Sequence, residues 1–291
     1  MKKNMNKNYF EVLRPGINST FQDNGRNNFY HIGIPFSGAM DNRNFLLANT
    51  ISNNEINNPV LEFAYQGPKL KYIGENISIN VTGDVNFKII RKNKNLEFSC
   101  YENIILENND CLDILSTNRS VYGYLSIGGT FEVDYYLNSC STNTKAKIGA
   151  NSGEKLEKGQ IIHLKNTKQI LPKNKIEYLN SKIENIRIIK GPHFDYFSKD
   201  AIDSFLSDEF NVTKLSDRMG IRLKGPKISN IKNTNIKSEG LVKGVIQITA
   251  DGDPIIMLSD HGTIGGYPKI GVVISADYDK LVQIPPGSKI K

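Results

Sequence analysis

Residues 255–274, IIMLSDHGTIGGYPKIGVVI, form the most informative stretch of the chain. Two apolar segments, 255–258 and 270–274, flank a polar link that contains an acid, an imidazole, a hydroxyl, three glycines and a lysine. Two strands can be joined by a much shorter turn. Glycine lets a backbone approach a ligand closely, and loops held between rigid strands often carry sites. The stretch therefore predicts two strands joined either by a functional loop or by an ordinary glycine-rich hairpin.

Outward from this stretch, strand patterns dominate the sequence. Short runs rich in β-branched and aromatic residues, bounded by Gly, Asn or Asp, occur at 10–13, 77–82, 87–91, 103–106, 122–127, 160–164, 186–189, 244–249 and 255–258. Only residues 41–51 and 197–206 have the pattern of helices. Many short strands with few short helices predict a mainly β protein, built as a barrel or a sandwich.

Similar turn motifs recur in the same order in the two halves of the chain. Residues 67–70 (GPKL) correspond to 225–228 (GPKI), and 81–84 (VTGD) correspond to 248–253 (ITADGD). Either a β unit is duplicated or the turn chemistry is similar by chance. We predict an N-terminal β domain at 1–183, which carries a long functional loop, and a C-terminal β domain at 184–291, which carries the glycine-rich link.

Composition bounds the function. The 291 residues are 38% hydrophobic, and no apolar run approaches the roughly 20 residues of a membrane span. The polar N-terminus does not resemble a signal peptide, and three cysteines with four scattered histidines suggest neither a disulfide framework nor a metal site. The net charge of +7 is spread along the chain rather than clustered. We therefore expect a cytoplasmic protein that binds no metal, membrane or nucleic acid.

Residues 14–41 form a long loop-like region with few apolar residues. Arg26 is suited to binding a carboxylate or phosphate. Gln22 and Asp23 are suited to holding an amide or orienting a nucleophile. Asp41 is a candidate catalytic acid, although capping the helix that follows it is the simpler interpretation.

Two further segments carry candidate site residues. Arg218, beside Gly220, is placed to reach an anionic ligand, or else to pair locally with Asp217, which would contribute little at a surface. Gln247 lies in an alternating strand, where it faces either a pocket or solvent. The sequence contains no phosphate-binding loop, dinucleotide fingerprint or nucleophile elbow.

Taken together and in this order, the segments resemble one family. The matching stretches are 15–26, 33–41, 48–49, 61–62, 67–68, Ser139 with 141–142, 191–192 with Phe197, 217–223, 238–247 and 254–269. The chain is similar to the family of the 5-oxoprolinase C subunit, also called allophanate hydrolase subunit 2 or the kinase A inhibitor antagonist (KipA) family. That family includes the carboxyltransferase portion of urea carboxylase.

The resemblance implies one or two cyclophilin-like barrels and an ATP-dependent hydrolase that opens 5-oxoproline to glutamate. It implies action in a complex with homologues of the A and B subunits of that enzyme, the latter of the kinase A inhibitor (KipI) type. ATP would be bound by the complex, and this chain would carry neither metal nor biotin. The implied site has Arg26, Asp41, Arg218 and Lys269 as catalytic residues, with Gln22, Gln247, Thr263, Gly265, Gly266 and Tyr267 binding substrate. We expect these residues to converge on one cleft.

The sequence departs from the family pattern in two places. After Leu137 the family usually has glycine followed by Ser-Arg-Ser-Thr-Asp, whereas Asn138, Cys140 and Asn143 replace the glycine, the arginine and the acid here. In the glycine-rich link, residues 262–264 (GTI) stand where the family commonly has a Gln-Thr-Thr run, so that only Thr263 matches the family pattern there.

Two alternative functions remain open at the level of sequence. One is the carboxyltransferase component of a biotin-dependent enzyme similar to urea carboxylase. This would need partner chains, because the sequence has no biotin-acceptor Met-Lys-Met segment. The other is a non-enzymatic antagonist of a sensor-kinase inhibitor.

Overall fold

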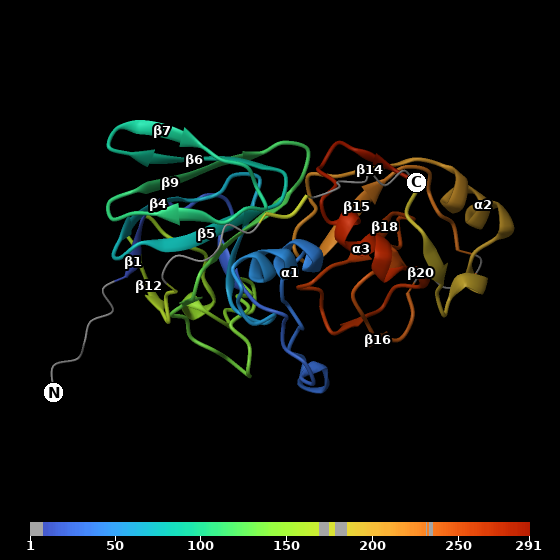
Figure 1. Cartoon of the computed structure of the whole chain (residues 1–291). Coiled ribbons are helices and arrows are strands. Elements are labelled where there is room, and N and C mark those ends of the chain that lie inside the picture. The colour runs from blue at the N-terminus through green and yellow to red at the C-terminus, as the bar shows by residue number, and fades with distance from the viewer. Residues whose placement is uncertain (1–7, 169–174, 178–184, 231, 233–234) are drawn as a thin grey trace. The chain divides into compact units, whose positions relative to one another are not determined.

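The computed structural model describes residues 8–168, 175–177, 185–230, 232 and 235–291. The chain forms two compact units, each mainly β (Figure 1). Unit 1 comprises residues 1–25 and 42–179, and unit 2 comprises residues 26–41 and 180–291. The predicted mainly β fold with few helices is confirmed: within the described residues, the α-helices are α1 (Asn42–Ile51), α2 (Lys199–Ser207) and α3 (Ser275–Leu281).

Unit 1 contains two antiparallel sheets. Their strands are β1 Tyr9–Arg14, β2 Thr20–Gln22, β3 Val60–Ala64, β4 Lys69–Ile73, β5 Ile77–Thr82, β6 Val85–Arg91, β7 Lys94–Glu97, β8 Ile104–Leu106, β9 Cys111–Thr117, β10 Tyr122–Ile127, β11 Thr130–Phe131 and β12 Ile161–Lys165. One sheet has the order β11-β12-β1-β4-β9-β6-β7 and the other β2-β3-β10-β5-β8. Apolar side chains from both sheets share one core, which includes Phe10, Phe63, Ile79, Leu112 and Leu125.

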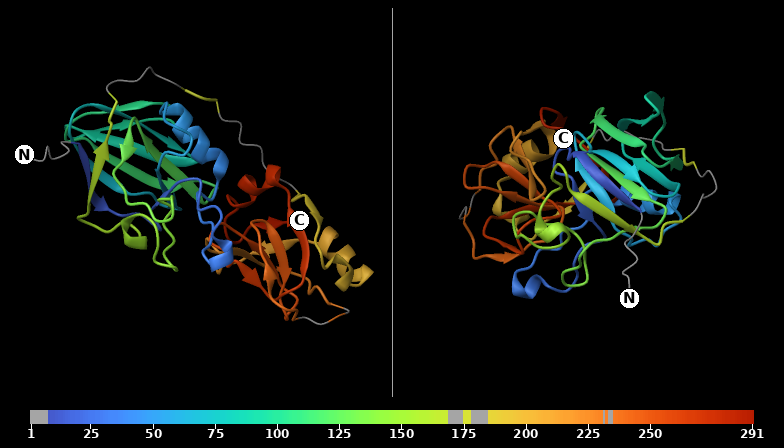
Figure 2. Two further views of the ribbon diagram at one scale, coloured as in Figure 1. Left: turned by 90° about the horizontal axis from the view of Figure 1, so that it is seen from below. Right: turned by 90° about the vertical axis from the view of Figure 1, so that its left-hand side faces the viewer.

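Strand β5 shows how α1 completes this unit. Its apolar residues alternate with Ser78, Asn80 and Thr82, a pattern that usually leaves the polar face in water, yet all six residues are buried. Helix α1 covers that face (Figure 2). Asn80 Nδ2 donates to Ala48 O at 3.0 Å, and Thr82 Oγ1 donates to Asn44 O at 2.9 Å. The buried polar row is therefore satisfied by the helix rather than by solvent.

Unit 2 is built on one curled antiparallel sheet with the order β13-β20-β17-β18-β15-β14-β21 and a separate ribbon, β16-β19 (Figure 2). The strands are β13 Ile188–Lys190, β14 Phe210–Val212, β15 Gly220–Lys224, β16 Glu239–Gly240, β17 Val245–Ile248, β18 Pro254–Met257, β19 Ile264–Gly265, β20 Lys269–Val273 and β21 Lys289–Ile290. Single 3₁₀ turns lie at Tyr30–Ile32 and Phe194–Tyr196 in this unit and at Asn151–Gly153 in unit 1.

The helix predictions need two corrections. Helix α2 begins two residues later than predicted, because the Ser198 hydroxyl caps it by accepting from Ala201 N at 3.2 Å. Helix α3 was not predicted. It is only seven residues long, and buried Asp277 in its first turn accepts hydrogen bonds from the backbone and guanidinium of Arg187. A long-range contact of this kind leaves no periodic signal in the sequence.

The domain prediction differs from the structure in one segment. Residues 26–41 were assigned to the first domain, but they cluster with unit 2. Ser37 N donates to Ser259 O at 2.9 Å, and Ser259 Oγ donates to Ala39 O at 3.3 Å. The predicted boundary at 183/184 lies outside the described residues. The proposed repeat matched residues 67–70 with 225–228. Strand β4 begins at Lys69 within the first motif, whereas no strand begins within the second, so this pair of motifs does not support a repeat.

None of the helices in the described ranges has both the length and the apolarity needed to cross a membrane.

Candidate functional site

The polar link singled out in the sequence forms a loop in unit 2 between β18 and β20, which we call the glycine loop (residues 258–268). Within it, β19 pairs with β16 so that Glu239 lies opposite Gly265 and Gly240 opposite Ile264. Leu241 N donates to Thr263 O at 3.0 Å, and Ile236 N donates to Gly266 O at 2.9 Å. The segment 236–241 therefore holds the loop along its length.

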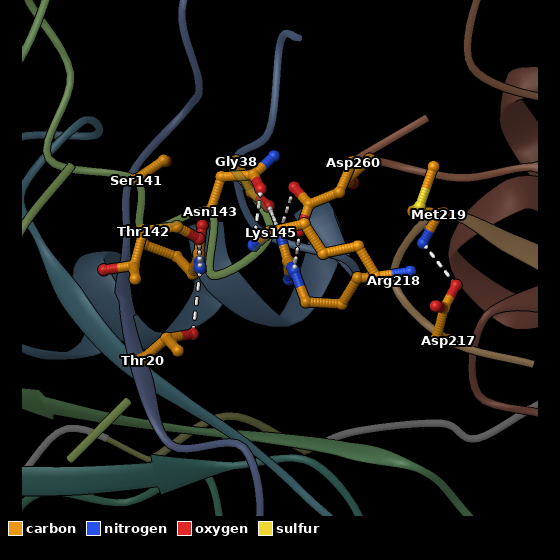
Figure 3. Close-up of polar contacts among 12 residues, drawn as sticks. Thr20, Gly38, Ser141, Thr142, Asn143, Lys145, Asp217, Arg218, Met219 and Asp260 are labelled. Atoms are coloured by element: carbon orange, nitrogen blue, oxygen red, sulfur yellow. Dashed lines mark hydrogen bonds and ion pairs between the residues drawn. The ribbon is translucent and has the colours of Figure 1, made fainter. Parts of the chain in front are cut away.

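An ion pair anchors the start of the glycine loop. Arg218 Nε donates to Asp260 Oδ2 at 2.8 Å, and Arg218 Nη2 donates to Asp260 Oδ1 at 3.2 Å and to Gly38 O at 2.7 Å (Figure 3). Ser37 and Gly38 both have positive φ, which turns the Gly38 carbonyl into this contact. The partner suggested for Arg218 by sequence was Asp217, whose Oδ1 instead accepts from Met219 N at 2.8 Å. Arg218 thus ties the 26–41 segment to the loop.

The far end of the loop is shaped by Gln247. This residue is buried on β17, and its Nε2 donates to Tyr267 O at 3.0 Å. A Cβ atom at Gly265 would lie 2.8 Å from Gln247 Nε2, so only glycine allows the amide to lie there. Gln247 therefore lies against Gly265 and Tyr267 of the glycine loop.

A second ion pair lies at Lys269, the first residue of β20. Its side chain is 4% exposed, and Nζ donates to Glu239 Oε2 at 2.7 Å. Glu239 is 49% exposed, and the hydrogen bond from Lys269 lowers the pKa of its carboxyl group. His193 Nε2 lies 3.6 Å from the same Oε2 atom. Lys269, Glu239 and His193 thus form a compact acid–base cluster.

The tautomer of His193 follows from its contacts. Lys269 N donates to His193 Nδ1 at 3.2 Å, so Nδ1 is an acceptor. Burial lowers the pKa of His193, and the Lys269 ammonium acts in the same direction against the opposing effect of Glu239. The ring is therefore neutral at pH 7 and carries its proton on Nε2, the atom that faces Glu239.

A further histidine lies inside the glycine loop. The Tyr30 hydroxyl lies 3.3 Å from His261 Nε2, and His261 Nδ1 lies 2.6 Å from Gly262 O. Since Nδ1 faces a carbonyl oxygen, it is the protonated ring nitrogen. Burial lowers the pKa of this imidazole as well.

The remaining predicted residues are split between the units. In unit 2, Arg26 is 2% exposed and its backbone N donates to Phe36 O at 2.7 Å, while Asp41 Oδ2 accepts from Gln283 Nε2 at 2.7 Å. Gln22 lies in unit 1, fully buried, and its Nε2 donates to Thr142 O at 3.0 Å and Thr20 Oγ1 at 2.9 Å. Gln247 thus contacts the glycine loop, and the convergence of the predicted residues on one cleft stays a prediction.

Asp23 organises the serine-rich loop of unit 1. Its fully buried carboxylate accepts from Ser139 Oγ at 2.6 Å, Ser141 Oγ at 2.5 Å and Cys140 N at 2.7 Å. The departures from the family pattern fit this loop. Asn138 has φ 60, a conformation that asparagine tolerates in place of glycine, and Asn143 Oδ1 accepts from Ala146 N at 3.0 Å, as an acid would.

Sequence reasoning missed the partners of Lys269. Glu239 was included only within the matching stretch 238–247, and His193 only as one of four scattered histidines. His193 directly follows the Gly191-Pro192 pair that carries part of the family resemblance, and this position was its one available signal. Among the described residues, no group of three or more His, Cys, Asp or Glu side chains is arranged to hold a metal ion.

The sequence of this mainly β chain matches a known protein family. Residues 32–291 match the family described as carboxyltransferase domain, subdomain A and B. The chain belongs to that family.

Individual relatives fall into two groups. The chain is 28% identical to the 5-oxoprolinase C subunit of Escherichia coli (strain K12) over 96% of this chain and 89% of that protein. It is 30% identical to urea amidolyase of Lachancea kluyveri over 97% of this chain but 17% of that protein. The crystal structure of the Kluyveromyces lactis urea carboxylase superposes with a TM-score of 0.89 and 29% identity, covering 100% of this chain and 28% of that one.

Proposed function

We propose that this chain is one component of an ATP-dependent 5-oxoprolinase, which opens 5-oxo-L-proline to L-glutamate. The alignment with the 5-oxoprolinase C subunit carries the proposal, because it extends over 96% of this chain and 89% of the relative. The amidolyase match covers only 17% of a much longer protein. A chain that corresponds to a free-standing subunit over most of its length is best assigned that subunit's role.

The chemistry fits a site of buried cations and amide-binding groups. A lactam is a stable amide, and a phosphoryl group on its oxygen would make the ring carbon electrophilic. We propose that the buried Lys269 ammonium stabilises the negative charge of the phosphorylated lactam oxygen. Gln247, Thr263, Gly265, Gly266 and Tyr267 would bind the substrate from the side of the glycine loop, which Glu239 borders by pairing with Gly265.

The other predicted residues have supporting roles in this proposal. Arg218 would act by holding Asp260, and so the glycine loop, in place. Arg26 and Asp41 stay proposed catalytic residues, and Gln22 a proposed substrate-binding residue.

The proposed enzyme works only as a complex. We propose that homologues of the A and B subunits of 5-oxoprolinase are the partners, that ATP binds to the assembled complex, and that the complex is cytoplasmic. The chain alone should hydrolyse no ATP, because its sequence carries no nucleotide-binding motif.

The test is release of glutamate from 5-oxo-L-proline in the presence of ATP, using this chain with and without its two proposed partners. Glutamate should appear only when this chain and both partners are present. Glutamate formed at the same rate when this chain is omitted would refute the proposal.

A carboxyltransferase role is the second candidate. It is favoured by the family match over residues 32–291 and by the TM-score of 0.89 to a urea carboxylase. In that role the same loop would hold urea, and a carboxybiotin carried by a partner chain would transfer its carboxyl group to a urea nitrogen, whose proton passes to the biotin nitrogen. Urea-dependent ATP hydrolysis with a biotin carboxylase partner, in place of glutamate release, would support it.

A further inference from the structure

A cavity of about 630 Å³ opens in unit 2 beside the acid–base cluster. Its lining includes His193, Tyr196, Lys232, Lys237 and Glu239. Glu239 belongs to both the cavity and the ion pair, since its Oε2 atom accepts from buried Lys269. The cavity therefore reaches the carboxylate that pairs with Lys269, the group proposed above to stabilise charge.

Glu239 has one oxygen to offer a ligand. Its Oε2 atom is taken by Lys269, whereas its Oε1 atom has no hydrogen-bond partner among the described residues. The side chain is about half exposed and lines the cavity. A carboxylate held in this way is an acceptor only, so it selects a ligand with an N–H or O–H donor.

The rest of the lining favours a ligand with negative charge. Lys232 and Lys237 supply two ammonium groups, and Lys269 lies behind Glu239. Glu239 is the carboxylate in this lining, and His193 is neutral. The two lysines therefore give the lining a net positive charge. Lys232 Nζ lies 4.5 Å from the centroid of the Tyr196 ring, which also gives the cavity one flat aromatic wall.

We propose that this cavity binds a small molecule that carries both a carboxylate and an amide N–H. Lys232 and Lys237 hold the carboxylate, and Glu239 Oε1 accepts the N–H. The inference rests on the proposed function, under which the ligand is 5-oxo-L-proline itself. It also separates the two candidate functions, because urea has N–H donors but no carboxylate.

The test is direct binding to the purified chain, followed by the imidazole NMR signals of His193, with His163 of unit 1 as an internal control. The probes are 5-oxo-L-proline, 2-pyrrolidone, which keeps the lactam N–H but lacks the carboxylate, and urea. We expect 5-oxo-L-proline to shift the His193 signals and to bind at least about tenfold more tightly than either of the others, since hydrogen bonds to charged groups are the stronger ones.

Variants locate the ligand within the cavity. Lys237→Ala and Glu239→Gln should each weaken 5-oxo-L-proline binding about tenfold. Lys227→Ala is the matched control, because Lys227 lies on the same unit, pairs with Asp253 and does not line the cavity. If Glu239→Gln fails to fold, exposed Lys237 carries the test alone.

Two outcomes would overturn the inference, and both differ from failure of the proposed function. Equal binding of 5-oxo-L-proline by Lys237→Ala and the control would place the ligand elsewhere. Tighter binding of urea than of 5-oxo-L-proline would refute the carboxylate requirement. An assembled complex that releases no glutamate, while the cavity still binds 5-oxo-L-proline in a Lys237-dependent way, would refute the function and leave the cavity assignment standing.

Discussion

The two ion pairs that hold the glycine loop are built differently. At its start, Arg218 and Asp260 have side chains only 14% and 7% exposed, with two hydrogen bonds between them and a third to Gly38 O. Just beyond its end, Lys269 is 4% exposed, but Glu239 is 49% exposed and contacts Lys269 through one oxygen. The first pair is sealed from solvent, and the second is open on one side.

This difference suggests that the two pairs have different roles. A sealed pair with satisfied partners contributes to one fixed loop conformation, and breaking it leaves an uncompensated buried charge. An open pair can contact a ligand while it stays intact, because Glu239 already meets solvent. We therefore expect changes at Arg218 to act mainly on stability and changes at Lys269 to act mainly on rate.

The largest expected effect is loss of stability in Arg218→Ala. Removing the guanidinium strands the buried Asp260 carboxylate, which should lower the free energy of unfolding by about 3 kcal/mol. Denaturant unfolding measures the change. Lys289→Ala is the control, because the Lys289–Glu209 pair is 62% and 59% exposed and should change stability by less than about 1 kcal/mol. Equal effects of the two variants would remove the basis of the comparison.

Lys269→Ala should act mainly on rate. Loss of a buried cation that meets developing negative charge is expected to slow the assembled enzyme by about 10²-fold. Glutamate release by the complex measures this, with formation of the complex checked by size-exclusion chromatography. Lys269→Arg, which keeps the charge, should recover part of the rate. A fully active Lys269→Ala complex would show that the open pair is not part of the site.

Glu239→Gln should have a smaller effect, of about tenfold in rate. The substitution keeps the shape of the side chain but removes the charge that pairs with Lys269. Because the Lys269 hydrogen bond lowers the pKa of Glu239, the native pair should persist until the pH falls below the usual range of a glutamate. The activity of the native complex should therefore fall with acidification in a way that Glu239→Gln does not. Parallel pH profiles for the two proteins would argue against this role.

The smallest effect concerns His193 and the pH dependence of stability. Its pKa is lowered in the folded chain, chiefly by burial, so between the folded and unfolded pKa values the unfolded chain binds more protons. Stability should then rise with pH through that window and decline as the pH falls below about 6.5. His193→Asn should flatten this slope, as measured by unfolding at pH 5 and pH 7. His261→Asn provides the comparison, since burial lowers the pKa of His261 in the same direction.

Local patterns were sufficient to predict much of the secondary structure. The strands at 77–82 and 122–127 were predicted to the residue, and the stretch at 255–274 forms two strands around a loop. Alternating β-branched residues and bounding glycines are local signals, so they can be read without knowledge of the fold. The family resemblance picked out Gln247 and the glycine loop as site segments, and in the structure Gln247 Nε2 donates to Tyr267 O of that loop.

The sequence by itself therefore determined the strand-rich class and the segments that carry the candidate site. Tertiary structure alone decided the partners: Asp260 for Arg218, Glu239 and His193 for Lys269, and unit 2 for residues 26–41. It also decided that the polar row of β5 is covered by α1. The physical reason is that hydrogen bonds and ion pairs form between residues far apart in the chain, and such pairings leave no period or spacing in the sequence that joins them.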